Sequence, residues 1–346
     1  MPNTEIQVGV LGATGFTGWE LMGLLLRHPH AKVAWLSSES QPGTAYSKIY
    51  PQFLGRLDPA VEKLRSFEDV KTTQPDVVFS CLPHAASAEC IAPFLANGKT
   101  VVIDLSADFR LKDVKLYEKV YAHTHPMPER VKDGRYGLCE IHGADIMGAK
   151  LIANPGCYPT SAILPLFPLI QSGIVSPDGI IIDAKSGVSG AGKKATETTH
   201  YVMANESIAA YGVGDKHRHR WEIQEQLSLA AGKKVDLLFT AHLIPMERGI
   251  LSTIYCDLKE GQSAATAEAC LHAKYDGSDF VRVRDDFPRT GDVKHSNFCH
   301  MKVYQPEGGR KLIIVSVIDN MVKGASGQAL QNMNVALGHP AAHGLA

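Results

Sequence analysis

A glycine-rich turn at residues 12–18, GATGFTG, constrains the fold more than any other feature of the sequence. It follows an apolar run at residues 7–11 and precedes residues 18–27, where leucines recur on one helical face. Glycines let the backbone turn tightly between a strand and a helix and approach a pyrophosphate, whose charge the helix N-terminal amides stabilise. The spacing is GxxGxxG rather than GxGxxG, and glycines alone specify little. In this context they predict a dinucleotide-binding turn, with a merely structural turn as the alternative.

The first half of the chain alternates strands and helices. Residues 32–37 are a candidate strand, residues 76–81 and 100–105 are short, continuous apolar runs, and residues 85–96 between these two runs have helical spacing. Continuous apolar strands separated by helices are typical of a parallel sheet that is covered on both faces. We therefore predict an α/β, Rossmann-type dinucleotide-binding domain.

The second half contains mostly strands, with few helices between them. Helical spacing is found at residues 262–274 and 326–336, and the predicted strands lie at residues 180–185, 236–244, 250–258, 280–283, 297–304 and 311–318. Runs of strands with hairpin-like connections predict a second, α+β domain with a mainly antiparallel mixed sheet. The boundary between the domains is expected near residues 154–157.

Composition excludes several classes of function. With 346 residues the chain has room for about two domains, since a domain usually has roughly 100–200 residues. Lys and Arg number 35 against 36 Asp and Glu, which argues against nucleic-acid binding. The apolar runs are shorter than the roughly 20 residues of a membrane span, and the polar N-terminus lacks a signal-peptide layout. The seven cysteines include no CxxC pair and predict thiols in the reducing cytoplasm.

The end of the second strand favours a phosphorylated cofactor. An acidic residue there would bond the ribose 2′-hydroxyl of NAD, whereas this strand ends in Ser37 and Ser38, with Glu39 one step later. Hydroxyls can donate to a 2′-phosphate, so we predict NADP(H). No arginine lies beside the serines in sequence, and ordinary turn serines are the alternative.

Cys157 is the predicted nucleophile. It lies in NPGCYPT, residues 154–160, between a short strand at residues 150–153 and an apolar helical segment at residues 161–170. Pro155 and Gly156 predict a turn that places Cys157 at the start of the helix, where the helix dipole and unpaired amides stabilise a thiolate. The alternative is a buried thiol at a domain junction.

A histidine cluster at residues 217–222, HRHRWE, supplies a candidate acid/base group. If a helix begins near Arg220, His219 and Glu222 share one face, and the carboxylate can orient the imidazole. His217 would then point elsewhere, and a solvated basic turn is the alternative. No histidine spacing resembles a metal motif such as HExxH, so no metal is expected.

Two loops are candidate anion sites. Residues 104–110, DLSADFR, follow a strand at its carboxyl end, where Arg110 could grip a carboxylate or phosphate. Residues 186–193, SGVSGAGK, offer successive amides for an anion but do not match a phosphate-binding Walker loop. A surface arginine and a simple loop are the respective alternatives.

These motifs, taken in order, resemble those of N-acetyl-γ-glutamyl-phosphate reductases, relatives of aspartate-semialdehyde dehydrogenase. The resemblance covers essentially the whole chain and includes motifs at residues 12–18, 36–40, 81–87, 104–111, 136–140, 154–160, 186–193, 217–223, 242–251 and 319–334. It implies a domain at 1–155 plus 320–346 that binds NADP, and a catalytic and oligomerisation domain at 156–319. It also implies a homodimer or homotetramer.

The resemblance assigns roles residue by residue. Cys157 matches the nucleophile, His219 the acid/base and Glu222 the acid that holds it. The implied cofactor contacts are Gly12, Thr14, Gly15, Thr17, Gly18, Ser38, Pro83 and Asn320. The implied substrate or active-site loop positions are Arg110, Ser186, Ser189, Gly190 and His217.

The implied reaction is the NADPH-dependent conversion of N-acetylglutamyl 5-phosphate into the 5-semialdehyde and inorganic phosphate through a Cys157 thioester, in arginine biosynthesis. Two alternatives stay open: a lysine-pathway reductase of a carrier-protein-linked aminoadipyl phosphate, and a non-catalytic NADP-binding sensor. Trp221 stands where the family commonly has proline, which affects the choice between His219 and His217. Cys139 also departs from the family pattern.

Overall fold

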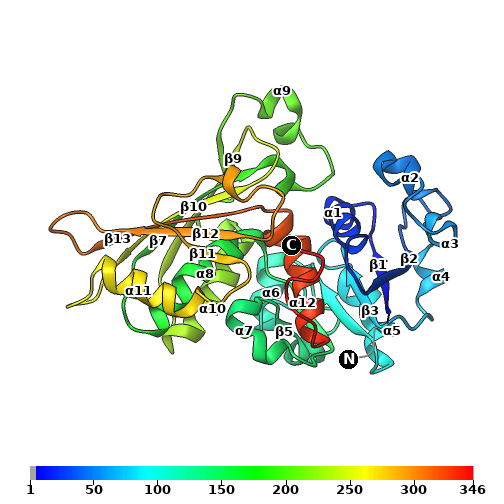
Figure 1. The fold of residues 1–346 in the computed structure, drawn as a ribbon, viewed down its shortest axis with the longest axis horizontal. Coiled ribbons are helices and arrows are strands. Elements are labelled where there is room, and N and C mark those ends of the chain that lie inside the picture. The colour runs from blue at the N-terminus through cyan, green and yellow to red at the C-terminus, as the bar shows by residue number, and fades with distance from the viewer. Residues whose placement is uncertain (1–4, 346) are drawn as a thin grey trace. The chain divides into compact units, whose positions relative to one another are not determined.

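The computed structural model describes residues 5–345, which divide into two compact units (Figure 1). Unit 1 contains the residues up to Pro155 and those from Ala325 onward, and unit 2 is Gly156–Gly324. The sequence put the return to the first domain at residue 320. Residues 320–324 instead stay with unit 2, because the Asp319 carboxylate accepts the N–H groups of Met321 and Val322 and the Asp319 carbonyl accepts that of Gly324.

Unit 1 is built on a six-stranded sheet in which every described pairing is parallel. In spatial order the strands are β2 (Ala31–Leu36), β1 (Ile6–Leu11), β3 (Val77–Ser80), β4 (Val101–Asp104), β6 (Leu151–Ala153) and β5 (Arg135–Tyr136). All residues of β3 and β4 are buried. The continuous apolar runs therefore form central strands covered on both faces, and the Rossmann-type prediction is confirmed.

Helices of unit 1 connect these strands. They are α1 (Phe16–Leu25), α2 (Tyr46–Ile49), α3 (Pro59–Glu62), α4 (Phe67–Val70), α5 (Ser87–Ala96), α6 (Val114–Tyr121), α7 (Cys139–Ile146) and α12 (Gly327–Ala336). Helix α12 returns from the C-terminal end of the chain and packs against α1, α7 and β4. Its buried residues Ala329, Leu330 and Met333 join the core formed by β1 and α1.

Unit 2 is built on a seven-stranded mixed sheet. In spatial order the strands are β11 (Val281–Val283), β12 (Cys299–Tyr304), β13 (Lys311–Ile318), β10 (Ile250–Asp257), β7 (Ile180–Gly187), β9 (Leu237–Ile244) and β8 (Ala209–Tyr211). The pairings β11–β12 and β7–β9 are parallel, and the other described neighbours are antiparallel. The prediction of a mainly antiparallel mixed sheet is therefore confirmed.

Helix α8 (Cys157–Gln171) is the central helix of unit 2. It is apolar all round and almost entirely buried, since it packs against β10 and β13 and also against α10 (Arg218–Ala231) and α11 (Ala264–Tyr275). Pro168 has no N–H for the carbonyl of Leu164, and the Tyr275 hydroxyl donates to that carbonyl instead. Of the two prolines inside the helix, Pro165 and Pro168, the second is thus compensated by a neighbouring helix.

The sequence underestimated the helices of unit 2. Helix α10 was expected only to begin near Arg220, because its polar surface and mixed pattern hide a helical stripe. It begins at Arg218 and continues to Ala231, ending at Gly232 in the left-handed conformation that glycine favours. Short helix α9 (Tyr201–Ala204) was not predicted. Across residues 5–345, helices that could cross a lipid bilayer, judged by length and apolarity, are not found.

Candidate active site

The glycine turn of unit 1 has the steric design predicted for a dinucleotide loop. Gly12 has φ +71°, and a Cβ there would lie 2.9 Å from the carbonyl oxygen of Cys81. A Cβ on Gly18 would lie 2.7 Å from Ala13, so α1 can pack this closely on the turn only with glycine. Gly15 is the N-cap of α1, and a Cβ there would have its nearest neighbour, the Gly12 carbonyl oxygen, 3.6 Å away. The start of α1 therefore has no side-chain cap, as a pyrophosphate site at helix N-terminal amides requires.

A group of hydroxyls surrounds the end of β2. The Ser38 Oγ lies 3.2 Å from the Thr14 Oγ1 and 3.2 Å from the Ser40 Oγ. Tyr50 donates its hydroxyl to the Thr14 carbonyl at 2.7 Å, which fixes the turn. These hydroxyls can donate to a phosphate oxygen.

The Glu39 carboxylate accepts the N–H of Phe67 at 2.5 Å, which ties it to the start of α4. Arg65, which the sequence did not associate with the serines, pairs with Ser37 in a parallel bridge, and its carbonyl accepts the Ser38 N–H. The Arg65 backbone therefore lies beside the serines in the fold, although it is distant from them in sequence. The hydroxyls of Thr14, Ser38 and Ser40 therefore fit a phosphorylated dinucleotide.

Thr17 and Pro83 lie on the same unit as this turn. Thr17 is in the first turn of α1, and its carbonyl accepts the hydroxyl of Ser326 at 2.8 Å. Pro83 is exposed in the loop that follows β3, at the carboxyl end of the sheet. Asp108 holds that loop, since its carboxylate accepts the N–H groups of Ala85 and Ala88. Two of the motifs found in sequence are thus parts of one structure.

Arg110 is not a surface arginine, because only 5% of it is exposed. Its Nε donates to the carbonyl of Asn154 at 2.7 Å, and its Nη2 donates to the carbonyl of Leu105 at 2.8 Å. Two of its five N–H donors therefore hold the backbone that leads toward Pro155.

In unit 2, Cys157 is the first residue of α8. Gly156 is the N-cap in an extended conformation, with no side chain capping the helix. The thiol therefore lies at the positive end of the helix dipole, which stabilises a thiolate. A Cβ on Gly324 would lie 2.7 Å from the Cβ of Cys157, so the backbone of residue 324 packs directly on the cysteine.

His219 lies against the turn that carries Cys157. A Cβ on Gly156 would lie 2.5 Å from the His219 Nε2, so the imidazole occupies the space that any larger residue would take. Only glycine at this position lets the ring approach the residue before the nucleophile. The structure therefore brings Cys157 and His219 together, although they are far apart in sequence.

Glu222 has a contact that the sequence did not suggest. It is 1% exposed, and its Oε1 accepts the N–H of Gly156 at 2.9 Å. From α10 the carboxylate therefore fixes the N-cap of α8, and with it the position of Cys157. A helical spacing of three from His219 suggested a bond to the imidazole, but such spacing says nothing about a partner on another helix.

His217 is the N-cap of α10, and its Nδ1 accepts the N–H of His219 at 3.2 Å. Its ring packs among Tyr158, Tyr211 and Phe239, with ring centroids 4.9–5.5 Å away. Burial, and then the charge of Arg218, lower the pKa of His217 from 6.5 to about 4. A histidine that stays neutral and caps a helix is poorly suited to proton transfer near pH 7, which favours His219.

Trp221 does not distort this region. Its indole N–H donates to the carbonyl of Asp215 at 3.2 Å, and the guanidinium of Arg220 lies 4.4 Å from its ring centroid. Arg220 also forms an ion pair with Asp215 at 3.0 Å. The tryptophan thus ties the preceding turn to the first turn of α10.

The loop after β7 is held by Asn320. The Asn320 Nδ2 donates to the Ser189 Oγ at 3.0 Å, and its Oδ1 accepts the N–H of Gly249 at 2.6 Å. A Cβ on Gly190 would lie 2.9 Å from the Ser186 Oγ, and Ser186 is itself only 1% exposed. Ser186, Ser189, Gly190 and Asn320 therefore form one compact group, in which a predicted cofactor contact, Asn320, meets three predicted substrate-loop residues.

Two tyrosines were missed by the sequence analysis. Tyr158 follows Cys157, and its hydroxyl accepts that of Tyr211 at 2.9 Å and donates to the His242 carbonyl at 3.3 Å. Burial, with Tyr211 beside it, raises the pKa of Tyr158 far above its usual value. The pair forms a wall beside His217, and only the tyrosine next to the nucleophile could have been noticed from the sequence.

Each of the two units matches a known protein domain. Residues 7–149 match the model of the semialdehyde dehydrogenase NAD binding domain, and residues 157–320 match that of the semialdehyde dehydrogenase dimerisation domain. A protein of Rhodospirillum rubrum named N-acetyl-gamma-glutamyl-phosphate reductase is 47% identical, over 99% of this chain and 97% of its own length. A Geobacter protein with the same name is 45% identical over 98% of both chains.

This chain belongs to the N-acetyl-gamma-glutamyl-phosphate reductase family. A relative in Arabidopsis thaliana, named as a probable, chloroplastic member of this reductase family, is 44% identical over 99% of this chain and 85% of its own length.

Solved structures show the same fold as this member of the reductase family. Aspartate semialdehyde dehydrogenase II of Vibrio cholerae matches with a TM-score of 0.71 at 18% identity, over 96% of this chain and 98% of that one. Aspartate semialdehyde dehydrogenase of Candida albicans, solved with NADP, matches with a TM-score of 0.67 at 17% identity, over the same shares. The two-domain fold class predicted from the sequence is therefore confirmed.

Proposed function

We propose that this protein reduces N-acetyl-L-glutamyl 5-phosphate to N-acetyl-L-glutamate 5-semialdehyde with NADPH, as a step of arginine biosynthesis. The observation that carries the proposal is the pairing at the start of α8, where Cys157 heads the helix and His219 packs on the glycine before it. The reductase relatives, which align over nearly the whole chain, support the substrate class.

Unit 1 holds the cofactor in this proposal. The pyrophosphate binds to the turn that contains Gly12, Thr14, Gly15, Thr17 and Gly18, in front of the α1 amides. The 2′-phosphate binds to the hydroxyls at Ser38, while Pro83 contacts the nicotinamide side. Asn320, which belongs to unit 2, is proposed as a further contact of the nicotinamide. When bound, NADPH supplies the hydride for the reduction.

Unit 2 supplies the nucleophile. The Cys157 thiolate attacks the acyl carbon and displaces inorganic phosphate, which leaves the acyl group as a thioester on the sulfur. A thioester is a better hydride acceptor than a carboxylate, so the thiol makes the reduction feasible. Arg110 and the loop with Ser186, Ser189 and Gly190 bind the substrate and draw charge from its phosphate.

His219 moves the proton. It protonates the oxyanion of the thiohemiacetal and takes the proton back as the thiolate leaves and the aldehyde forms. Glu222 is a positioning residue in this scheme, because its carboxylate fixes the Gly156 N–H. His217 shapes the substrate side through its ring and holds the start of α10.

The test is the reverse reaction, the phosphate-dependent reduction of NADP⁺ by N-acetylglutamate semialdehyde. We expect activity in the unaltered protein, none in Cys157→Ala, and unchanged activity in Cys270→Ser, which alters a cysteine of α11. NADPH binding by Cys157→Ala should be unchanged. Turnover by that variant, or no turnover by the unaltered protein, would contradict the proposal.

An assay of the forward reaction separates the alternative functions. In the forward direction, N-acetylglutamyl phosphate is compared with the carrier-linked aminoadipyl phosphate, whose side chain is one methylene longer. A preference for the longer substrate would assign the protein to lysine biosynthesis instead. Binding of NADPH without turnover of either substrate would make it a sensor.

We further propose a homodimer or homotetramer in the cytoplasm. The match of residues 157–320 to a dimerisation domain supports self-association. Within residues 5–345 none of the seven cysteines forms a disulfide, which supports a reducing compartment. Sedimentation of the purified protein gives the number of subunits, and a monomer at working concentrations would contradict the proposed assembly.

A further inference from the structure

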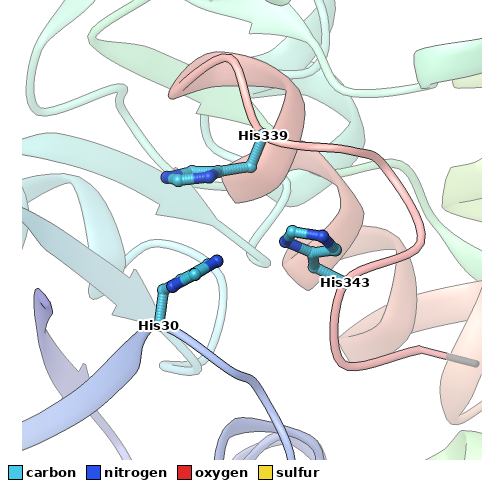
Figure 2. Close-up of side chains that lie close together, drawn as sticks. All are labelled: His30, His339 and His343. Atoms are coloured by element: carbon cyan, nitrogen blue, oxygen red, sulfur yellow. The ribbon is translucent and has the colours of Figure 1, made fainter. Parts of the chain in front are cut away.

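Three histidines of unit 1 that have no role in the proposed reaction lie close together. His30 precedes β2, whereas His339 and His343 follow α12, and one nitrogen from each ring lies within 4.8 Å of the other two (Figure 2). We propose that they bind a divalent transition-metal ion, with zinc as the representative, which fastens the C-terminal segment to the start of β2.

The backbone that carries these rings is fixed by other contacts. The carbonyl of His30 accepts the N–H of Ile6, so the residue is held by β1. On the other side, the Asn334 Nδ2 donates to the carbonyls of Ala341 and His343. The site is therefore formed by segments that the fold already positions, which lowers the entropic cost of binding.

His28 joins the two sides and is not one of the proposed ligands. Its Nε2 lies 2.9 Å from the Asn334 Oδ1, and its Nδ1 accepts the N–H groups of His30 and Ala31. Both ring nitrogens of His28 are thus used by the protein. It holds His30 in place, in the manner of the residues that surround metal ligands.

The geometry suits a metal ion bound by imidazoles. Tetrahedral zinc with Zn–N distances of about 2.0–2.1 Å separates its ligand nitrogens by about 3.4 Å, so rotation of the side chains has to bring the three nitrogens closer than their present 4.8 Å limit. The ring centroid of His30 lies 5.2 Å from that of His339 and 5.3 Å from that of His343, and the rings must turn their in-plane nitrogens toward a common ion. Imidazole is a good ligand for zinc, copper and nickel.

A further observation favours a ligand. The Nδ1 of His343 is buried and has no hydrogen-bond partner among the described residues, which is costly unless something else satisfies it. His339 lies in the same group, with one ring nitrogen within 4.8 Å of a nitrogen of His30 and of His343. The sequence prediction of no metal considered helical spacings such as HExxH and could not see His30 beside this segment.

The test is a titration of the full-length protein, without an affinity tag, with Co²⁺. A Cys157→Ser background removes thiolate binding at the proposed active site. We expect one Co²⁺ per chain, visible ligand-field bands of a nitrogen-bound ion, and no sulfur-to-cobalt charge-transfer band. Zn²⁺ should displace it. His339→Gln and His343→Gln should each weaken binding by at least about tenfold.

The matched control is His272→Gln, which alters an exposed histidine of α11 paired with Asp276 and should leave binding unchanged. Zn²⁺ should also slow amide hydrogen exchange over residues 339–345 in the unaltered protein. No uptake up to about 1 mM metal would overturn the proposal. Uptake that persists when His30, His339 and His343 are all replaced by Gln would overturn it as well.

Discussion

Gly15 of unit 1 and Gly156 of unit 2 cap their helices in the same way, but their surroundings differ. Both are extended N-cap residues without a side-chain cap, and each starts a helix whose first amides are available to an anionic group. At Gly15 a Cβ would make only an ordinary contact, with the Gly12 carbonyl oxygen 3.6 Å away, whereas at Gly156 the His219 Nε2 would be 2.5 Å from it. A side chain could therefore be added at Gly15 without a clash, whereas at Gly156 it would displace the ring of His219, the proposed acid/base group.

Among these variants, replacing the imidazole of His219 should change kcat the most. His219→Asn removes the proposed acid/base group and should lower kcat about 10²–10⁴-fold, while the KM for NADPH stays close to that of the unaltered protein. His217→Asn should lower kcat far less, since asparagine can still cap α10. Steady-state kinetics of both variants make the comparison, and a larger loss in His217→Asn would exchange their roles.

The two glycines provide the direct test of the comparison. Gly156→Ala should displace His219 and lower kcat about 10²-fold, and its effect should not add to that of His219→Asn. Gly15→Ala fits the fold but narrows the approach of the pyrophosphate, so it should raise the KM for NADPH. If Gly156→Ala raises KM and leaves kcat unchanged, the two turns do not differ as described.

Cofactor selectivity should respond to the hydroxyls at the end of β2. Ser38→Asp places a carboxylate where the 2′-phosphate is proposed to bind, and should raise the KM for NADPH about tenfold or more by charge repulsion. The KM for NADH serves as the internal control, because that cofactor lacks the phosphate. An equal change for both cofactors would mean that Ser38 does not contact the 2′-phosphate.

The smallest effect concerns stability rather than rate. Folding lowers the pKa of His217 from 6.5 to about 4, so the unfolded chain binds the proton more readily in this window. The contribution is complete above pH 6.5 and is lost as pH falls toward 4. Between pH 7 and pH 5 it should cost the unaltered protein about 2 kcal/mol more than His217→Asn. Urea unfolding at both values measures this, and equal losses would contradict the shift.

The sequence predicted what depends on local pattern. The apolar runs of the first half gave the parallel sheet, the turn residues placed Cys157 at a helix start, and the glycine spacing indicated the loop before α1. Each of these follows from neighbours along the chain, through backbone conformation or periodicity. The family resemblance then supplied the remaining roles.

Contacts between distant segments were not predictable in this way. Arg65 reaches the end of β2 through a bridge to Ser37. Glu222 accepts the N–H of Gly156, whereas the sequence suggested only His219 as its partner. Likewise, His30 meets the segment after α12 only because that helix returns to unit 1. A single sequence carries no periodic signal for such pairs, since their geometry is set by packing.

The central claim is that Cys157 carries the acyl group, and acyl transfer without NADPH tests it most directly. The protein is mixed with N-acetylglutamyl phosphate, quenched in acid, digested and analysed by mass spectrometry, while released phosphate is measured. We predict one phosphate per active site and an N-acetylglutamyl adduct on the peptide that contains Cys157. An unmodified Cys157 in a preparation that turns over fully with NADPH would contradict the account.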